Sequence, residues 1–309
     1  MIKYYYKSLR TASIQEADDY KRGAWVYVEA PSEHEIELLA EKFKLDRGIL
    51  QDALDTDEMP RLEKEDEVSY IFVRFAMMNE EKELVTMPLL FVFGKELLMT
   101  VSLVRLPPLA MFIQNKIEFA TTQRAKLVLQ ILNLVSDHYD NYIATTSKQI
   151  KLIRAHLRRH AISNRDFVEF VTIEDELNEF LSALVPTNAT LRRLMLGRYM
   201  PLFEEDQDIV EDLLLNNEQS IESCNSNLKS VANIREAYSS ISANNLNRTI
   251  KVLTIATVMI AIPNLFFSMY GMNLPLPLQS HPWAFPALIS FSLALLLGVA
   301  LYGRRKKIF

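Results

Sequence analysis

The spacing of hydrophobic and polar residues changes twice along the 309-residue chain. Up to residue 105, short β-branched and aromatic runs alternate with amphipathic stretches, which predicts strands alternating with helices. Residues 106–200 and 201–248 carry apolar side chains at helical spacing, and residues 249–309 are mostly apolar. We therefore expect an α+β membrane protein with four parts: an α/β domain, a helical layer, a stalk helix and a hairpin of two transmembrane helices.

The first part predicts a mixed sheet with helices packed on it. Ser32 and Glu35 form a capping-box pattern that opens a helix through Phe43, and Asp46 can cap another through Leu54. The chain has 7 glycines and no glycine-rich phosphate loop, so a nucleotide is not an expected partner. Five runs have strand composition: Ile2–Tyr6, Ala24–Ala30, Val68–Met78, Leu84–Phe93 and Glu96–Ser102.

The second and third parts predict long helices. Apolar residues recur at helical spacing from Gln123 to Ala161 and from Asn164 to Arg198, with an interruption expected at Pro186. Between Pro201 and Pro263 there is neither proline nor glycine, so one helix of about 60 residues can run into the first membrane segment. That helix could be a lever or a passive support, and the sequence leaves both open.

Two uncharged runs, Val252–Tyr270 and Trp283–Tyr302, are each long enough to cross a hydrocarbon core of about 30 Å. The segment GMNLPLPLQSHP between them predicts a tight external turn. Lys251 precedes the first run and Arg304–Lys307 follow the second, so the positive-inside rule places both ends in the cytoplasm. Buried helices of a soluble core are the alternative, but these seldom form two full-length uncharged spans before a basic stop.

One face of the first span is mostly small or polar toward its outer end. Pro263 frees a backbone carbonyl, and the Asn264 side chain is costly in hydrocarbon unless it faces a partner or water. The face could line an aqueous path or pack against another helix, and spacing alone leaves both open. Because two helices have no interior, conduction would require several subunits around an axis. The residues at steps of three or four are Ile250, Leu253, Thr257, Ala261, Asn264 and Ser268.

Composition narrows the classes of function. Cys224 is the only cysteine, which excludes an intrachain disulfide and fits a reducing compartment. The N-terminus has no secretory signal, so we expect the soluble part in the cytoplasm. The net charge of −5 gives no electrostatic case for nucleic acid. The 5 histidines are scattered and neither HExxH nor GxSxG occurs, which argues against a membrane-anchored enzyme.

The run Tyr270-Gly271-Met272-Asn273, directly after the first of two C-terminal spans, resembles the CorA family of magnesium transporters. The segments NRTIKVLTIATVMI and QDALDTDEMPRLEKEDEVSYIFVRF are similar to that family too, and the resemblance is weakest between Leu106 and Pro201. It implies a homopentamer, which would sit in membrane lipid. The absence of a transit peptide favours a bacterial or archaeal plasma membrane over a mitochondrial one. The resemblance also implies Mg²⁺ as both transported and regulatory ion, with cobalt and nickel tolerated.

The resemblance assigns roles to particular residues. Gly271, Met272 and Asn273 would form the selectivity filter, where neutral oxygens can hold a hydrated Mg²⁺ by its waters. Asp52 and Asp212 would meet between subunits around a regulatory Mg²⁺, although each alone fits a solvated surface or a helix cap. The positions facing the pore would be Glu236, Asn247, Ile250, Leu253, Thr257, Ala261 and Asn264, and Ser268 continues their stripe.

The sequence departs from the family pattern in two places. The external turn has no acidic residue, and its one titratable group is His281. A lone histidine in a loop is usually just solvent exposed. Pro263 lies one residue later than the proline of the family's first span, and Ile262 of this chain stands at the family's proline position. A gradient-driven magnesium channel, gated by cytoplasmic Mg²⁺, is the leading hypothesis because no ATP-binding motif occurs. A zinc or other divalent-metal transporter on the same scaffold and a non-conducting membrane-anchored sensor are the alternatives.

Overall fold

The structure is a computed structural model that describes residues 1–309 except 12, 80, 108, 158–163, 274–279 and 306–309. The chain forms two compact units, Met1–Ala232 and Asn233–Phe309, which are treated one at a time below. Helix α6 (Glu204–Tyr270) contributes to both units. The finer division into four parts remains a prediction.

The first unit is built on a seven-stranded mixed sheet with the order β2-β1-β3-β7-β6-β5-β4. Strands β3 and β7 pair in parallel and all other neighbours are antiparallel. The five predicted strands and the mixed sheet are confirmed. The strands are β1 (Ile2–Tyr6), β2 (Gln15–Ala17), β3 (Trp25–Glu29), β4 (Arg61–Glu65), β5 (Val68–Met78), β6 (Leu84–Phe93) and β7 (Leu98–Ser102).

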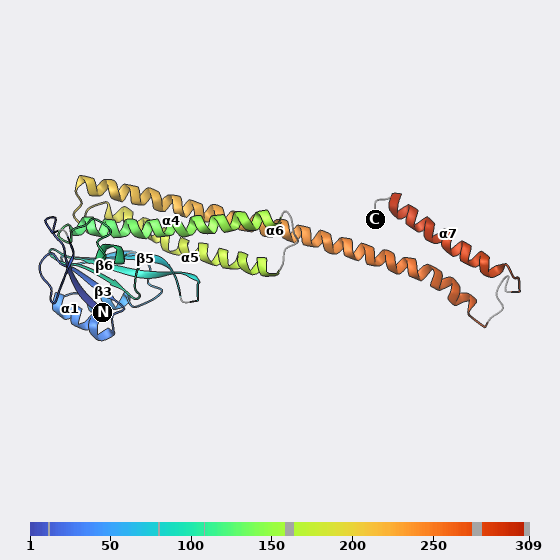
Figure 1. Ribbon diagram of the computed structural model, residues 1–309, viewed down its shortest axis with the longest axis horizontal. Coiled ribbons are helices and arrows are strands. Elements are labelled where there is room, and N and C mark those ends of the chain that lie inside the picture. The colour runs from blue at the N-terminus through green and yellow to red at the C-terminus, as the bar shows by residue number, and fades with distance from the viewer. Residues whose placement is uncertain (12, 80, 108, 158–163, 274–279, 306–309) are drawn as a thin grey trace. The chain divides into compact units, whose positions relative to one another are not determined.

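Both faces of the sheet are covered by helices, with α1 (Glu33–Phe43) on one side and α4 (Arg124–Leu157) and α5 (Asn164–Leu194) on the other (Figure 1). Val26, Leu90 and Met99 belong to the core beneath α1 and the short helix α2 (Arg47–Asp52). Because both faces are buried, the central strands read as continuous apolar runs without polar alternation.

The predicted caps are present. Ser32 Oγ accepts from Glu35 N at 3.3 Å, and the Glu35 carboxylate accepts from Ser32 N at 2.8 Å, which completes the capping box of α1. Asp46 Oδ1 accepts from Ile49 N at 2.8 Å and caps α2. These bonds satisfy amide groups that have no partner inside a helix. Helix α2 ends at Asp52, two residues before the predicted end.

One difference from the predicted long helices is that α5 runs through Pro186 without interruption. The prediction of a break there was wrong. Proline removes one helical hydrogen bond, but α5 contacts β4, β5 and β6 and so is held against the sheet. Asn217 on α6 also donates to Leu184 O at 2.9 Å, close to the proline. Helix α5 ends at Leu194, before Pro201 and four residues before the predicted end at Arg198. The last predicted residues of α4, 158–161, lie outside the described residues.

Helices α4 and α6 run parallel and are joined by polar pairs one heptad apart. Asp140 accepts from Ser220 Oγ, and Asn227 Nδ2 donates to Ser147 Oγ at 2.7 Å, each pair being 80 residues apart in the sequence. Polar groups at such positions specify the register between helices at some cost in stability. The buried residues of α6 within the first unit are Asp206, Val210, Leu213, Asn217, Ser220, Cys224 and Val231.

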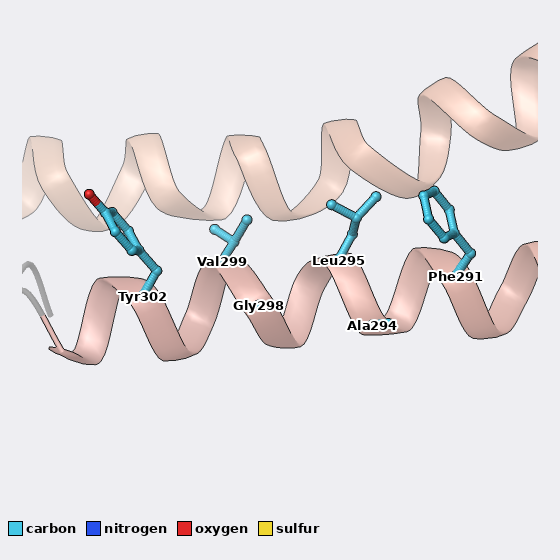
Figure 2. A pocket seen from close by; sticks show the side chains of 6 residues that line it. All are labelled: Phe291, Ala294, Leu295, Gly298, Val299 and Tyr302. Carbon is cyan, nitrogen blue, oxygen red and sulfur yellow. The ribbon is translucent and has the colours of Figure 1, made fainter.

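The second unit contains the end of α6 and helix α7 (Ala284–Arg305), two helices long and apolar enough to cross a membrane. Their most apolar windows are 0% and 6% buried, which does not fit core helices of a soluble protein. An open apolar groove of about 450 Å³ follows α7, and its side chains Phe291, Leu295, Val299 and Tyr302 point toward the neighbouring helix (Figure 2). It is lined by Phe291, Ala294, Leu295, Gly298, Val299 and Tyr302.

We predict that Asn217→Ala lowers the free energy of unfolding by about 1 kcal/mol, because the buried hydrogen bond from Asn217 Nδ2 to Leu184 O is lost. Denaturant titration of the purified protein measures the change. The neighbouring Asn216→Ala is the matched control and should stay within about 0.5 kcal/mol of the parent. Equal effects of the two substitutions would contradict the role given to Asn217.

Candidate functional site

The stripe of small and polar residues lies on the part of α6 that belongs to the second unit. At about 100° per residue, Ile250, Leu253, Thr257, Ala261, Asn264 and Ser268 share one side of the helix. All six are exposed within the single chain. Glu236 and Asn247 are also exposed on α6 and lie within about 60° of Ile250 around the helix axis.

The opposite side of α6 is the one that α7 covers. Ile255, Met259, Ile262 and Phe266 are half-buried, and their mean direction is about 170° from that of the stripe. Phe266 meets Phe291 of α7 edge to face, with ring centroids 5.4 Å apart. Within one chain, therefore, the stripe is not the face on which the two membrane helices pack. Whether it lines a path remains a prediction.

The Gly-Met-Asn run follows the end of the stripe. Helix α6 ends at Tyr270, and Gly271 N donates to Phe267 O at 3.0 Å while Met272 N donates to Met269 O at 3.3 Å. A side chain at Gly271 would place its Cβ 3.4 Å from Phe267 O, so the chain passes close to the helix end there. Asn273 is exposed, and the adjoining residues 274–279 lie outside the described part of the chain.

The electrostatics of this helix end favour a cation. The carbonyl groups of the last turn give the C-terminus of a helix a partial negative charge. The last turn of α6 has no basic residue to neutralise it. Gly271, Met272 and Asn273 therefore continue from an end that attracts cations without any carboxylate.

In the external turn, His281 stacks on the Trp283 ring at 5.6 Å, which gives it an ordinary packing partner. Lys306 and Lys307 of the predicted basic tail lie outside the described residues, whereas Arg304 and Arg305 are the last residues of α7.

The two aspartates of the predicted regulatory site lie on different elements of the first unit. Asp52 is the last residue of α2, and its Oδ2 accepts from Arg61 Nη2 at 2.7 Å. Asp212 is exposed on α6. Among the described residues, no group of three or more His, Cys, Asp or Glu side chains is arranged to hold a metal. A site between subunits is not tested by one chain and remains a prediction.

Two arginines that the sequence analysis missed, Arg61 and Arg74, contact the acidic segment of residues 52–58 and hold it in place. Arg61 pairs with Asp52, Glu58 and Glu63, and its guanidinium lies 4.3 Å from the centroid of the Phe72 ring. A basic residue three positions after Glu58 is a weak signal, because such pairs are common on solvated surfaces. Its contact with a core aromatic ring could not be read from the sequence.

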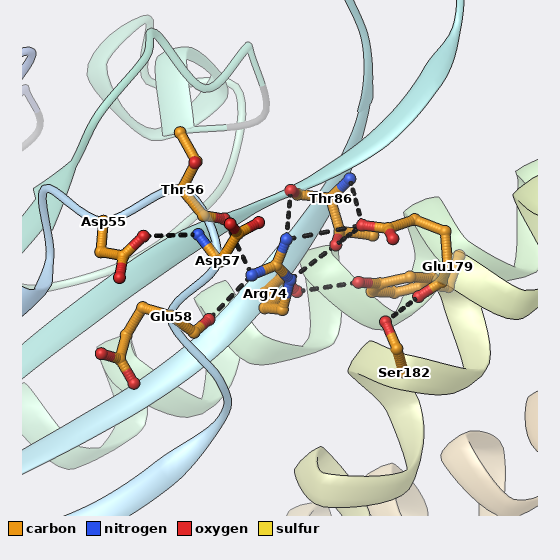
Figure 3. A network of polar contacts seen from close by, with 9 residues as sticks. Asp55, Thr56, Asp57, Glu58, Arg74, Thr86, Glu179 and Ser182 are labelled. Carbon is orange, nitrogen blue, oxygen red and sulfur yellow. Dashed lines mark hydrogen bonds and ion pairs between the residues drawn. The ribbon is translucent and has the colours of Figure 1, made fainter.

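Arg74 is buried and forms a denser network (Figure 3). It donates to Thr56 O at 3.0 Å, to Glu58 O at 2.8 Å and to Thr86 O at 2.7 Å, and it pairs with Glu179 of α5 at 3.4 Å. The signal that could have revealed it is an arginine within the otherwise apolar run of β5, since a buried charge needs partners. Arg74 thereby fixes the backbone of the acidic segment to the sheet and to α5.

Comparison with known proteins places these features in a family. The model of the family described as CorA-like Mg2+ transporter protein matches residues 20–305. The cobalt/magnesium transport protein CorA of Methanocaldococcus jannaschii is 25% identical over 280 residues, covering 87% of this chain and 85% of that protein. The magnesium transport protein CorA of Wolinella succinogenes is 23% identical over 316 residues, covering 96% and 94%.

A solved structure shares the fold over the full length. The complete CorA magnesium transporter from Methanocaldococcus jannaschii matches with a TM-score of 0.85 and 22% identity, covering 99% of this chain and 98% of that one. The resemblance based on the Tyr-Gly-Met-Asn run is thus confirmed, together with the fold class.

We predict that Arg74→Ala lowers the free energy of unfolding by about 3–5 kcal/mol, because Glu179 loses its cation and the buried Thr86 carbonyl, with two partly buried carbonyls, loses its donor. Arg192→Ala removes a surface arginine paired with Glu218 and should cost no more than about 1 kcal/mol. Denaturant titration of both variants checks the difference. A cost at Arg74 no larger than that at Arg192 would show that the network is not a structural requirement.

Proposed function

Since this chain belongs to the family of CorA-like Mg2+ transporter proteins, we propose that it carries Mg²⁺ across a membrane down the electrochemical gradient. The path is an axis surrounded by α6 helices from several copies of the chain. The observation that carries the proposal is the exposed stripe of α6 on the side that α7 leaves open. A polar face of this kind in a membrane helix needs water or a neighbouring protein surface.

Assembly supplies what one hairpin lacks. Cyclic symmetry would bring the same face of each α6 helix to a common axis, while α7 separates those helices from lipid. The family resemblance implies five copies. The membrane is taken to be the plasma membrane of a bacterium or archaeon. The basic residues that flank the hairpin place both ends of the chain inside by the positive-inside rule.

Ion entry is assigned to the ring of Gly271, Met272 and Asn273. Mg²⁺ gives up its water reluctantly, so a ring of neutral amide and carbonyl oxygens can hold the hydrated ion without trapping it. The negative ends of several α6 helices would add to the attraction. This arrangement does not need the acidic residues that the external turn lacks.

The stripe changes character along the helix. Asn264, Ala261 and Thr257 offer small or polar surfaces below the filter, whereas Leu253 and Ile250 would form an apolar ring. Apolar constrictions close a path by excluding water from it. Opening then requires only that the α6 helices separate at that level, and Asn247 and Glu236 would receive the ion on the cytoplasmic side.

Closure is assigned to Mg²⁺ bound between Asp52 of one copy and Asp212 of the next. A cation held by both carboxylates stabilises the closed assembly, and without it their repulsion favours separation. This gives feedback on the cytoplasmic Mg²⁺ concentration. Asp52 is 47% exposed at its side chain, so a cation can reach it from solvent.

In liposomes with an inside-negative potential, we expect the purified protein to admit Mg²⁺ and the Asn273→Ala variant to lose that flux while still assembling. The reason is that each copy loses a neutral oxygen at the filter. His281→Ala, in the same external turn, should keep the flux. A normal flux through the Asn273 variant would remove the filter assignment, and no flux through the parent protein would remove the transport proposal.

The double substitution Asp52→Ala with Asp212→Ala should let Mg²⁺ flux continue at millimolar internal Mg²⁺, where the parent closes, because both ligands of the regulatory ion are lost. The control is Asp208→Ala, one helical turn before Asp212 on α6. Closure of the double variant at the same Mg²⁺ concentration as the parent would place the feedback elsewhere.

A further inference from the structure

Arg61 occupies the centre of an acidic stretch of chain. Residues 52–58 contain Asp52, Asp55, Asp57 and Glu58, and Arg61 follows at the start of β4. Its guanidinium contacts Asp52 Oδ2 at 2.7 Å through Nη2, and Nη1 and Nε pair with Glu58 and Glu63. All three nitrogen atoms of the guanidinium therefore meet carboxylates.

The contact between Arg61 and Asp52 is held in place from several sides. The guanidinium packs over the Phe72 ring at 4.3 Å, and only 28% of the Arg61 side chain is exposed. Arg74 fixes the intervening chain by donating to Thr56 O and Glu58 O (Figure 3). Asp52 at the end of α2 and Arg61 at the start of β4 are thus held together by the fold, in contrast to a pair of freely moving surface side chains.

In this geometry the Arg61 guanidinium is a cation that contacts Asp52 when no metal ion is bound. The Asp52 side chain remains 47% exposed, so a divalent cation can reach the carboxylate, but there it meets a group already paired with the guanidinium, which also pairs with Glu58 and Glu63. A cation bound at Asp52 must share the carboxylate with Arg61 or displace it. Like charges a few ångströms apart in a partly solvated site change an affinity by about threefold to tenfold.

We propose that Arg61 is the resident counter-cation of Asp52 and sets the concentration at which a divalent cation is captured there. The inference rests on the proposed function, in which Asp52 is a ligand of the regulatory cation. In the absence of metal, Arg61 reduces the repulsion among the carboxylates of Asp52, Glu58 and Glu63. With rising metal concentration the cation and the guanidinium compete for the same carboxylate.

A purely structural Arg61 would make a different prediction. If the arginine only holds α2 and β4 together, its loss lowers stability and leaves the affinity for the cation unchanged or weaker. If it competes, its loss increases the affinity. The sign of the change therefore separates the two roles.

The test follows resistance of the purified full-length protein to limited proteolysis as MgCl₂ is titrated. The midpoint for Arg61→Gln should fall about threefold to tenfold below that of the parent. Arg61→Lys keeps the positive charge and should therefore move the midpoint less than Arg61→Gln does. Arg192→Gln removes an equal charge elsewhere in the same unit and should leave the midpoint unchanged. Arg61→Met retains apolar contact with Phe72 and takes the place of the glutamine variant if that one does not fold.

Asp52→Asn separates failure of this inference from failure of the proposed function. We expect that variant to lose the response to Mg²⁺. If it does, and the neutral Arg61 variants keep the parent midpoint or shift it upward, the competition is overturned while the regulatory site stands. A full response in Asp52→Asn would overturn both, because Asp52 would then not be a ligand.

Discussion

A polar group inside hydrocarbon must find a partner, because no water is present to satisfy it. Helix α6 meets this requirement for its backbone by being continuous, and Thr257 donates its hydroxyl to Leu253 O at 2.9 Å within the same helix. Exposing the Asn264 amide to lipid would be costly. This side chain lies on the exposed side of α6, which α7 does not cover. The cost of exposing these polar groups to lipid is the reason to expect several hairpins to assemble around a water-filled axis.

Within the first unit, the N-terminal part of α6 is held by specific contacts. The sheet is covered on both faces, and α6 is aligned with α4 by two polar pairs one heptad apart, with Asn217 bonded to α5 as well. Movement of α6 along α4 would break these pairs together. In the same unit, Arg61 and Arg74 both contact the acidic segment of residues 52–58. The positive charge next to Asp52 therefore comes from a residue that is fixed to the sheet.

The sequence predicted what depends on local pattern. Long apolar strands such as β5 and β6 were recovered at their observed bounds, as were the capping box at Ser32 and the uninterrupted α6. The edge strands β2 and β4 were missed because they are short and charged, which is typical of sheet edges. Pro186 was misjudged because packing from α6 and the sheet, which no local pattern reveals, holds the helix around it.

For the candidate site, spacing on α6 correctly grouped the stripe, but the direction of α7 relative to it required coordinates. Arg74 and Glu179 lie 105 residues apart and are brought together only by the fold. Asp52 and Asp212 were identified by resemblance alone, and their meeting in an assembly remains a prediction.

The most direct measurement compares the reactivity of single cysteines on the two sides of α6 in assembled protein, with Cys224 replaced by serine. Thr257→Cys lies on the stripe and Met259→Cys on the side that α7 covers. Modification by a water-soluble, membrane-impermeant thiol reagent should be fast at position 257 and slow at position 259, because the thiolate forms only where water reaches it. Equal reactivity at both positions, or none at position 257 in the presence and absence of Mg²⁺, would contradict a water-filled axis bounded by this face of α6.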